Sequence, residues 1–377
     1  MSYYLQAITL GLFAALIFRS NQRRSIFPQI VTGTWIVGVS AIYWRYGPVG
    51  QWSFYQNDQY FHWKVVEQFL ASDFNLTFDR MNFLRVPFTG PAFALAQVGF
   101  DTTLSLKFIS LCCALGSINL VEGFLARRQV RLSLIRFWMI AGPITMFFSL
   151  LALRETMMIL CVSYLFLGTS QSGKVLSILS LVILRPHLAA AILFGQIWGW
   201  LFSRLRSNLY FPSIFASAIL PIFIGTIGFS IGNYIIYDSP LRLHQSLFLK
   251  EQVIQIFSAF VGLQFFTVAN QTVEYTTQSL LLIRLIFPEI VLVPFAFTIS
   301  CFFFVPRLTR LKISVLATFV FFMSVSSGTE YLSVRQSLPM MPIMGVVAIL
   351  TFVQPKVSKM QTRIEDLPTA STAQPGE

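Results

Sequence analysis

Charged residues are scarce in this chain. Asp, Glu, Lys and Arg account for 11% of the 377 residues, whereas a soluble globular domain carries about 25%. Hydrophobic residues account for 55%, and the mean hydropathy is +0.69. This balance excludes a sizeable soluble domain. The formal net charge of +12 does not indicate nucleic-acid binding, because the Lys and Arg residues fall in short segments between apolar runs, as in the cytoplasmic loops of membrane proteins.

Motifs for nucleotides and zinc are missing as well. The sequence has no phosphate-binding P-loop, no glycine fingerprint after a strand, and no His/Cys cluster with zinc spacing. We therefore expect no ATP hydrolysis by the chain itself. The four cysteines lie inside apolar segments, which indicates small buried hydrophobic residues and no disulfide framework. They are Cys112, Cys113, Cys161 and Cys301.

Long apolar runs recur from one end of the chain to the other. Runs such as Ser213 to Ile236 and Leu280 to Val305 reach the roughly 20 residues that cross a bilayer as a helix. The run from Tyr3 to Phe18 has no basic residue before it and no small-residue cleavage site after it, so we interpret it as a retained span and not as a signal peptide. We predict an all-α fold, a polytopic transmembrane helical bundle of about 11 spans, within a range of roughly 10 to 13.

The expected crossings follow the apolar runs. They are Tyr3 to Phe18, Ile30 to Trp44, one crossing within Val86 to Ala126, Phe137 to Leu153, Thr156 to Gly168, Val175 to Leu184, Leu188 to Phe202, Ser213 to Ile236, Gln278 to Val305, Ile313 to Ser327, and Leu338 to Val353. Within Val86 to Ala126, we expect the part from Val86 to Phe100, with its prolines, to be re-entrant or interfacial. The short run Val175 to Leu184 must borrow neighbouring residues, because about ten residues cannot cross the hydrocarbon as a helix.

Basic clusters orient these spans. Clusters follow the first run at Arg19, Arg23 and Arg24, and recur at Arg127 to Arg136, at Lys174, at Arg204 to Arg206, at Arg307 to Lys312, and at Lys356 to Arg363. Because cytoplasmic loops are enriched in Lys and Arg, we expect the N-terminus outside, the C-terminus in the cytoplasm, and a multi-pass location in the plasma (inner) membrane.

The expected domain organisation is simple. Residues 1–355 form a single transmembrane domain, with outer loops at about residues 45–85 and 238–277. Each outer loop contains an amphipathic stretch suited to an interfacial helix. Residues 356–377 are rich in Thr, Pro and Gln, which predicts a disordered cytoplasmic tail.

Ionisable residues gather on the predicted outer side. In the segment Gln56 to Trp63, Asp58 could act as a general base towards a hydroxyl acceptor, or help to hold a divalent ion against a lipid-linked phosphate. The structural alternative is an N-cap at Asp58, with Tyr60 among the aromatic residues that anchor an interfacial helix.

Two further pairs stand between apolar runs. Arg154 could bind phosphate through its guanidinium, while Glu155 could serve a metal or an acceptor; the alternative is structural pairing with another span. Beside Pro186, Arg185 suits a phosphate group and His187 suits a metal or a phosphate oxygen, although a lone His at a helix end is often structural.

A last group opens the final span. Glu330 is a further outer-side acid, and Arg335 stands before a proline-containing apolar helix, where it could bind an anionic lipid headgroup. The structural alternative is an interfacial anchor. The metal candidates are Asp58, Glu155 and His187, and the sequence requires no other cofactor.

These features resemble a known family. Asp58-Gln59-Tyr60, Arg154-Glu155 and the run Arg335-Gln336-Ser337-Leu338-Pro339 are similar to the pattern of GT-C superfamily membrane glycosyltransferases, which include protein mannosyltransferases and lipid A aminoarabinose transferases. The resemblance implies that Asp58 takes the place of the catalytic acidic residue and Glu155 that of the second outer-loop acid. It also implies an inverting mechanism and a polyprenyl-phosphate sugar donor.

The expected function is therefore transfer of a sugar from a polyprenyl-phosphate donor to an extracytoplasmic glycan, lipid or protein acceptor. We expect Arg154, Arg185 and Arg335 to hold the phosphate, with Tyr60, His187 and Glu330 near the substrate. A divalent metal ion is the candidate cofactor. Two alternatives stay open. One is an exopolysaccharide or O-antigen polymerase that uses polyprenyl-pyrophosphate oligosaccharides, because Arg154 and His187 also resemble that family. The other is a flippase or transporter of lipid-linked sugars.

Overall fold

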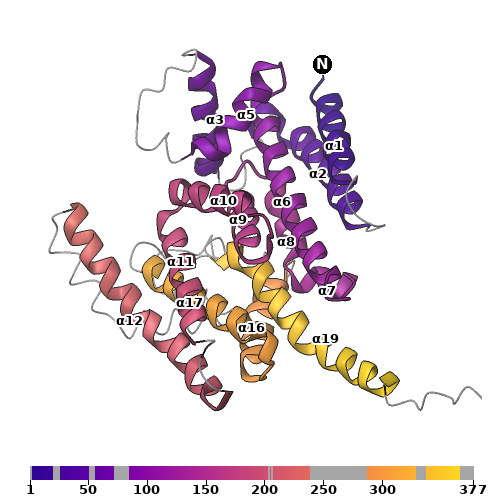
Figure 1. Cartoon of the computed structure of the whole chain (residues 1–377). Coiled ribbons are helices and arrows are strands. Elements are labelled where there is room, and N and C mark those ends of the chain that lie inside the picture. The colour runs from indigo at the N-terminus through magenta and orange to yellow at the C-terminus, as the bar shows by residue number, and fades with distance from the viewer. Residues whose placement is uncertain are drawn as a thin grey trace, which may run out of the picture.

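The computed structural model describes residues 2–19, 26–50, 56–71, 85–202, 204, 207–237, 287–327 and 337–365. Within these ranges every regular element is a helix (Figure 1), which confirms the all-α class. The helices are α1 (Tyr3–Arg19), α2 (Phe27–Gly50), α3 (Gln56–Ala71), α5 (Val86–Gln97), α6 (Thr102–Ala126), α7 (Leu134–Met139), α8 (Gly142–Ser149), α9 (Glu155–Leu167), α10 (Gln171–Leu184), α11 (Pro186–Phe202), α12 (Tyr210–Tyr237), α16 (Glu289–Phe302), α17 (Thr309–Ser327) and α19 (Met341–Glu365), with short 3-10 helices η1 (Ser207–Leu209), η2 (Pro306–Leu308) and η3 (Leu338–Met340).

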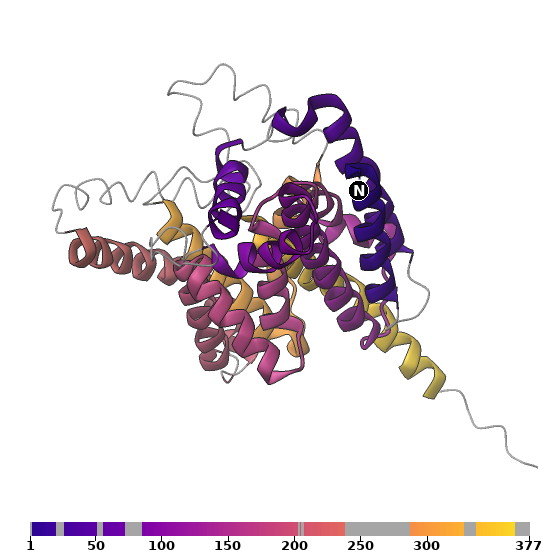
Figure 2. The ribbon, with the colours of Figure 1, turned by 90° about the horizontal axis from the view of Figure 1, so that it is seen from above.

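Helix α6 forms the centre of the N-terminal half. It begins at Thr102 because the Asp101 carboxylate caps it, with Oδ1 accepting a hydrogen bond from the Leu104 N–H at 2.9 Å. Helices α1, α2, α3, α5, α8 and α9 all pack against it (Figure 2). Because neighbours surround α6, its apolar residues are buried along most of its length and not on one stripe only.

The C-terminal half is built on a close contact between α11 and α17. A Cβ added to Gly195 would lie 1.9 Å from the Thr318 Oγ1, and one added to Gly199 would lie 1.9 Å from the Ser314 Oγ. Glycines spaced four apart let two helix backbones approach closely, as in many membrane helix pairs. Helix α12 also packs along α17, and the Trp198 Nε1–H of α11 donates to the Ser217 hydroxyl of α12 at 2.9 Å.

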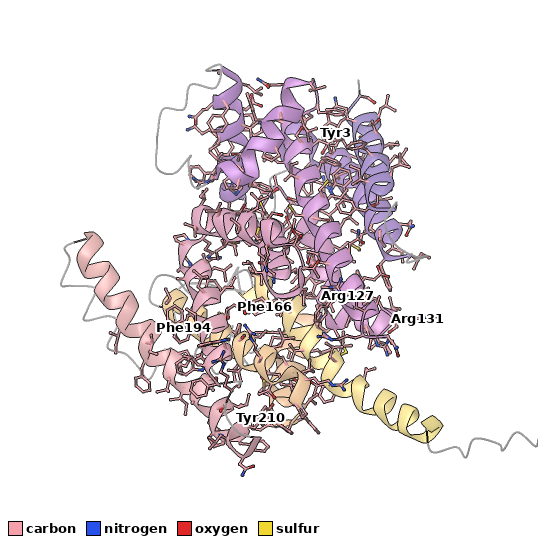
Figure 3. All side chains as sticks on the ribbon, in the orientation of Figure 1. Tyr3, Arg127, Arg131, Phe166, Phe194 and Tyr210 are labelled. Atoms are coloured by element: carbon pink, nitrogen blue, oxygen red, sulfur yellow. The ribbon has the colours of Figure 1, made fainter. Side chains whose placement is uncertain are left out.

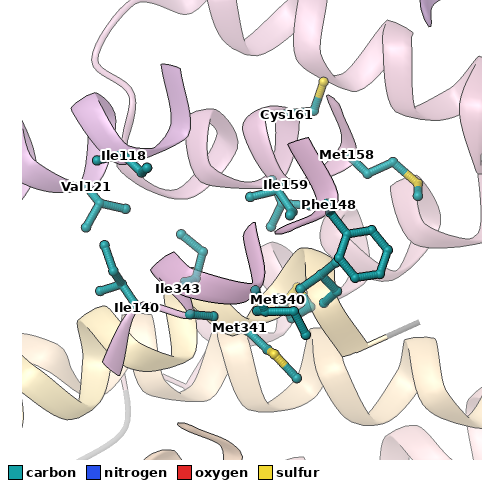
Figure 4. Packing of buried hydrophobic residues seen from close by; sticks show 14 of the residues in the cluster. Ile118, Val121, Ile140, Phe148, Met158, Ile159, Cys161, Met340, Met341 and Ile343 are labelled. Atoms are coloured by element: carbon teal, nitrogen blue, oxygen red, sulfur yellow. The ribbon is translucent and has the colours of Figure 1, made fainter. Parts of the chain in front are cut away.

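An apolar layer joins the two halves. Figure 4 shows Ile118 and Val121 of α6 close to Ile140, with Ile159 of α9 and Ile343 of α19 beside them. All five side chains are buried. The last helix therefore packs into the core by its first turns, while its far end projects from the bundle (Figure 1).

Two of the described helical segments, Thr102–Ala126 and Pro306–Val325, are long and apolar enough to cross a membrane by length and composition. Seven other apolar helices are shorter, at 10–17 residues. Helix α5 has only 12 residues, so the long helix between Val86 and Ala126 is α6. Figure 3 places Tyr3 near the top of the molecule and Tyr210 near the bottom, with Arg127 and Arg131 between them in height.

Two expected segments, Phe137 to Leu153 and the tail from residue 356, differ in the structure. The expected crossing Phe137 to Leu153 is divided, because Ala141 adopts a left-handed conformation (φ 55°) between α7 and α8. Helix α10 begins at Gln171, as the borrowing of neighbouring residues predicts. Helix α19 continues to Glu365 and so includes residues 356–365 of the predicted tail, where Lys, Met, Gln and Arg favour helix; residues 366–377 lie outside the described ranges.

Candidate functional site

The chain leaves the helical conformation between α8 and α9. Side chains of other helices form hydrogen bonds with the backbone groups of this break. The Trp35 Nε1–H of α2 donates to the Ser149 carbonyl at 3.0 Å, and the Ser110 hydroxyl of α6 donates to the Leu153 carbonyl at 3.2 Å. The Ala152 N–H donates to the Gln59 Oε1 of α3 at 2.9 Å. Buried backbone groups need such partners, so three side chains stabilise this break.

Arg154 and Glu155 lie where α9 begins. Glu155 is 1% exposed and occupies the first turn of α9, where the helix dipole favours a carboxylate. The Arg154 Nη1 donates to the Leu184 carbonyl at 3.0 Å, and Leu184 is the last residue of α10. Arg154 therefore reaches the second break in the chain, the one between α10 and α11.

Arg185 and His187 form this second break together with Pro186. Arg185 is extended (φ −161°, ψ 80°), because a proline disfavours helix in the residue before it. The Arg185 Nε–H donates to the His187 Nε2 at 3.1 Å, and Phe322 of α17 lies against both side chains. The His187 ring is parallel to that of Phe322 within 11°, with 5.6 Å between centroids.

His187 is held neutral by this arrangement. Burial lowers its pKa to about 4, with further contributions from the positive charges of Arg185 and Arg154. The hydrogen bond has the same requirement, since Nε2 accepts from Arg185 and carries no proton of its own. The breaks thus bring Arg154, Arg185 and His187 together, although 30 residues separate the first two. We call these three residues with Glu155 the break site.

The remaining predicted residues divide into two sets. Asp58 belongs to the first turn of α3, next to Gln59, so its backbone lies beside the α8–α9 break, and its side chain is outside the described part. Tyr60 is 44% exposed and lies 5.5 Å from the Trp63 ring, away from these contacts. Glu330 and Arg335 lie outside the described residues, but η3, which follows them, packs on α9.

The structure also shows polar residues that the sequence analysis missed. Gln59, Trp35 and Ser110 hold the α8–α9 break. Lys107 of α6 is fully buried, and its Nζ has no hydrogen-bond partner among the described residues. Asp101 is the charged group that acts on it, and burial raises the pKa of Asp101. A lysine inside an apolar run was the signal that could have identified this residue.

Asp58, Glu155 and His187 are the residues predicted to bind a metal. Within the described part of the chain, no three His, Cys, Asp or Glu side chains are grouped so that they could hold a metal ion. Of the three candidates, only Glu155 and His187 have described side chains. His187 presents an unprotonated nitrogen, but that nitrogen already accepts from Arg185.

Comparison with protein-family models, with curated proteins and with solved structures gives no match for this chain.

Proposed function

We propose that this chain is an integral membrane glycosyltransferase that transfers a sugar from a polyprenyl-phosphate donor to an acceptor outside the cytoplasm. The protein lies in the plasma (inner) membrane, with about 11 crossings, an outer N-terminus and a cytoplasmic C-terminus. The break site faces the outer side.

One observation carries this proposal: two helix breaks meet and gather two guanidinium groups in apolar surroundings. Arg154 binds the end of α10, and Arg185 and His187 follow directly. Irregular backbone at membrane depth is tolerated where it is buried in protein or lines a cavity. Guanidinium groups make bidentate hydrogen bonds to phosphate, so this pair suits the phosphate of a lipid-linked donor.

The chemistry follows from these charges. Asp58 takes the proton from the acceptor hydroxyl as its oxygen attacks the anomeric carbon of the sugar. The bond between that carbon and the phosphate oxygen breaks, and the polyprenyl phosphate leaves with the electron pair. Arg154 and Arg185, with Arg335, stabilise the charge that develops on the phosphate, which replaces much of the acid catalysis that an ordinary glycoside needs. Glu155 orients the acceptor or a divalent ion.

A second candidate is supported by the same breaks. Transporters often use discontinuous helices whose ends point at a substrate near the middle of the membrane. The chain could then move a lipid-linked sugar without forming a new bond. A polymerase would use the same arginines but would take a polyprenyl-pyrophosphate oligosaccharide.

The test is transfer of radiolabelled sugar in membranes that contain the protein. A panel of polyprenyl-phosphate sugars is offered to the wild type, to Asp58→Asn, and to Glu67→Gln at equal expression. Glu67 is a matched control, because it lies on the same helix but binds the Thr102 hydroxyl at the start of α6. We expect Asp58→Asn to lose transfer by about a hundredfold or more, and Glu67→Gln to keep it.

Each other result points elsewhere. Unchanged transfer by Asp58→Asn removes this residue from catalysis. Transfer only from polyprenyl-pyrophosphate oligosaccharides identifies a polymerase. Movement of the lipid-linked sugar across proteoliposomes without a new glycosidic bond identifies a transporter.

A further inference from the structure

A basic surface lies at the C-terminal end of α6. Figure 3 shows Arg127 and Arg131 there, between the end of α6 and the start of α7. The basic surface consists of Arg127, Arg128, Arg131 and Arg136, together with Leu134, Ile135 and Trp138 of α7. It is far along α6 from the break site, since Ser110 contacts the first break and Arg127 follows the last residue of the helix.

Local contacts hold the guanidinium groups of Arg127, Arg128 and Arg136. The Phe124 ring lies 4.1 Å from the Arg128 Cζ and 5.9 Å from the Arg127 Cζ. The Arg127 Nη2 donates to the Leu167 carbonyl at 3.3 Å, and the Arg136 Nη1 donates to the Arg131 carbonyl. Each guanidinium group has five N–H donors, and these contacts use only some of them, so other N–H groups remain for a ligand.

Basic residues outnumber acidic ones in this stretch of chain, and Glu122 is the nearest acid before the cluster. No Asp or Glu occurs from Gly123 to Leu153. Burial lowers the pKa of Arg128, and the like charge of the neighbouring Arg127 lowers it further. A bound anion would relieve this repulsion.

Exposed apolar side chains stand beside the arginines. Leu134, Ile135 and Trp138 are 65%, 75% and 38% exposed, on a helix of only six residues. A tryptophan with aliphatic neighbours next to basic residues is typical of the membrane interface, where the ring lies at headgroup level and the aliphatic groups contact acyl chains. The two chemistries together match one molecule, an anionic lipid.

We propose that the basic surface is a binding site for an anionic phospholipid of the cytoplasmic leaflet, with the headgroup phosphate on Arg127 and Arg131 and the acyl chains against Leu134, Ile135 and Trp138. The proposal rests on the membrane location in the proposed function and not on its transferase activity. Such a lipid would hold the lower end of α6 and α7 at a fixed depth.

The test uses the full chain in detergent micelles, titrated with dioleoylphosphatidylglycerol or with dioleoylphosphatidylcholine. The apparent Kd is taken from the thermal stabilisation that the lipid produces. Each variant is compared with its own baseline in phosphatidylcholine, which corrects for any stability lost with the Leu167 contact. We expect Arg127→Gln/Arg131→Gln to bind phosphatidylglycerol about thirtyfold more weakly, or about 2 kcal/mol at 1.4 kcal/mol per tenfold. Trp138→Ala should weaken binding of both lipids.

A double variant with the same charge loss elsewhere is the control. Lys174→Gln/Arg204→Gln removes one basic residue in the first turns of α10 and another that stacks on Trp200, 4.0 Å from its ring centroid. This control should bind phosphatidylglycerol like the wild type. Equal loss in both double variants would show a diffuse charge effect and would overturn the site, as would an unchanged Arg127→Gln/Arg131→Gln.

Alkaline carbonate extraction separates the two proposals. A wild-type chain that leaves the membrane in carbonate contradicts the membrane location and the proposed function with it. A chain that stays in the membrane but does not prefer phosphatidylglycerol contradicts only the lipid site.

Discussion

Replacement of Gln59 by leucine tests whether α3 holds the α8–α9 break. Gln59 is fully buried, and its Oε1 accepts the Ala152 N–H at 2.9 Å. Leucine has nearly the same size but no acceptor, so Gln59→Leu leaves the N–H of Ala152 buried without this hydrogen bond. The change is local, since the rest of the helix can keep its position.

The cost follows from desolvation. A buried donor that loses its acceptor costs about 1–3 kcal/mol, which is more than the net value of the hydrogen bond itself. Ala152 is also fully buried, so water cannot replace the amide oxygen without a change in packing. We therefore expect the free energy of unfolding to fall by about 1–3 kcal/mol. Because Asp58 precedes Gln59, sugar transfer should fall as well.

The assay is reversible unfolding in mixed micelles with increasing SDS mole fraction. The matched control is Gln68→Leu, an exposed glutamine on the same helix. Its stability should change by less than about 0.5 kcal/mol. Wild-type stability for Gln59→Leu, or an equal loss for Gln68→Leu, would refute the role of Gln59 at the break.

Substitutions of His187 and Lys107 test the contribution of each residue's charge state to stability. His187 has a folded pKa of about 4, below its unfolded value near 6.5. Its contribution to stability is therefore present above pH 6.5 and is lost as the pH falls from there towards 4, by up to about 3 kcal/mol. A His187→Gln variant should lose this part of the pH dependence in unfolding measurements, and a pH profile identical to that of the wild type would contradict the neutral imidazole. Lys107→Met replaces a buried ammonium by an apolar chain of similar length, so the free energy of unfolding should rise by about 1–4 kcal/mol. A destabilised variant would show that Lys107 has a partner that is essential to the fold.

The helices were predictable to the extent that local rules decide them. The break at Arg185 follows from Pro186, which lacks an N–H and restricts the residue before it. The break between α8 and α9 contains neither glycine nor proline, so the sequence gives no local reason for it. It exists because Trp35, Ser110 and Gln59 bind its backbone, and those partners lie 114, 43 and 93 residues away in the chain.

The residues of the break site were also predictable, but their grouping was not. Arg154, Arg185 and His187 stand out because ionisable groups are rare between apolar runs. Their meeting depends on how α9 packs against α10, which no sequence pattern specifies. The supporting residues were missed because a buried Gln or Ser looks the same in sequence as an exposed one. Lys107 was missed inside the apolar run of α6, where its charge should have identified it.

The cost of the two breaks connects the fold to the proposed chemistry. An unbroken helix satisfies its own backbone, so a break in apolar surroundings needs side chains from other helices to remain stable. Here α2, α3 and α6 each provide one, and Arg154 itself binds the open end of α10. A purely structural bundle would gain nothing from this arrangement, because continuous helices would avoid the cost. The arrangement is useful if two guanidinium groups must be held together in an apolar site, and phosphate is an anion whose geometry such a pair matches.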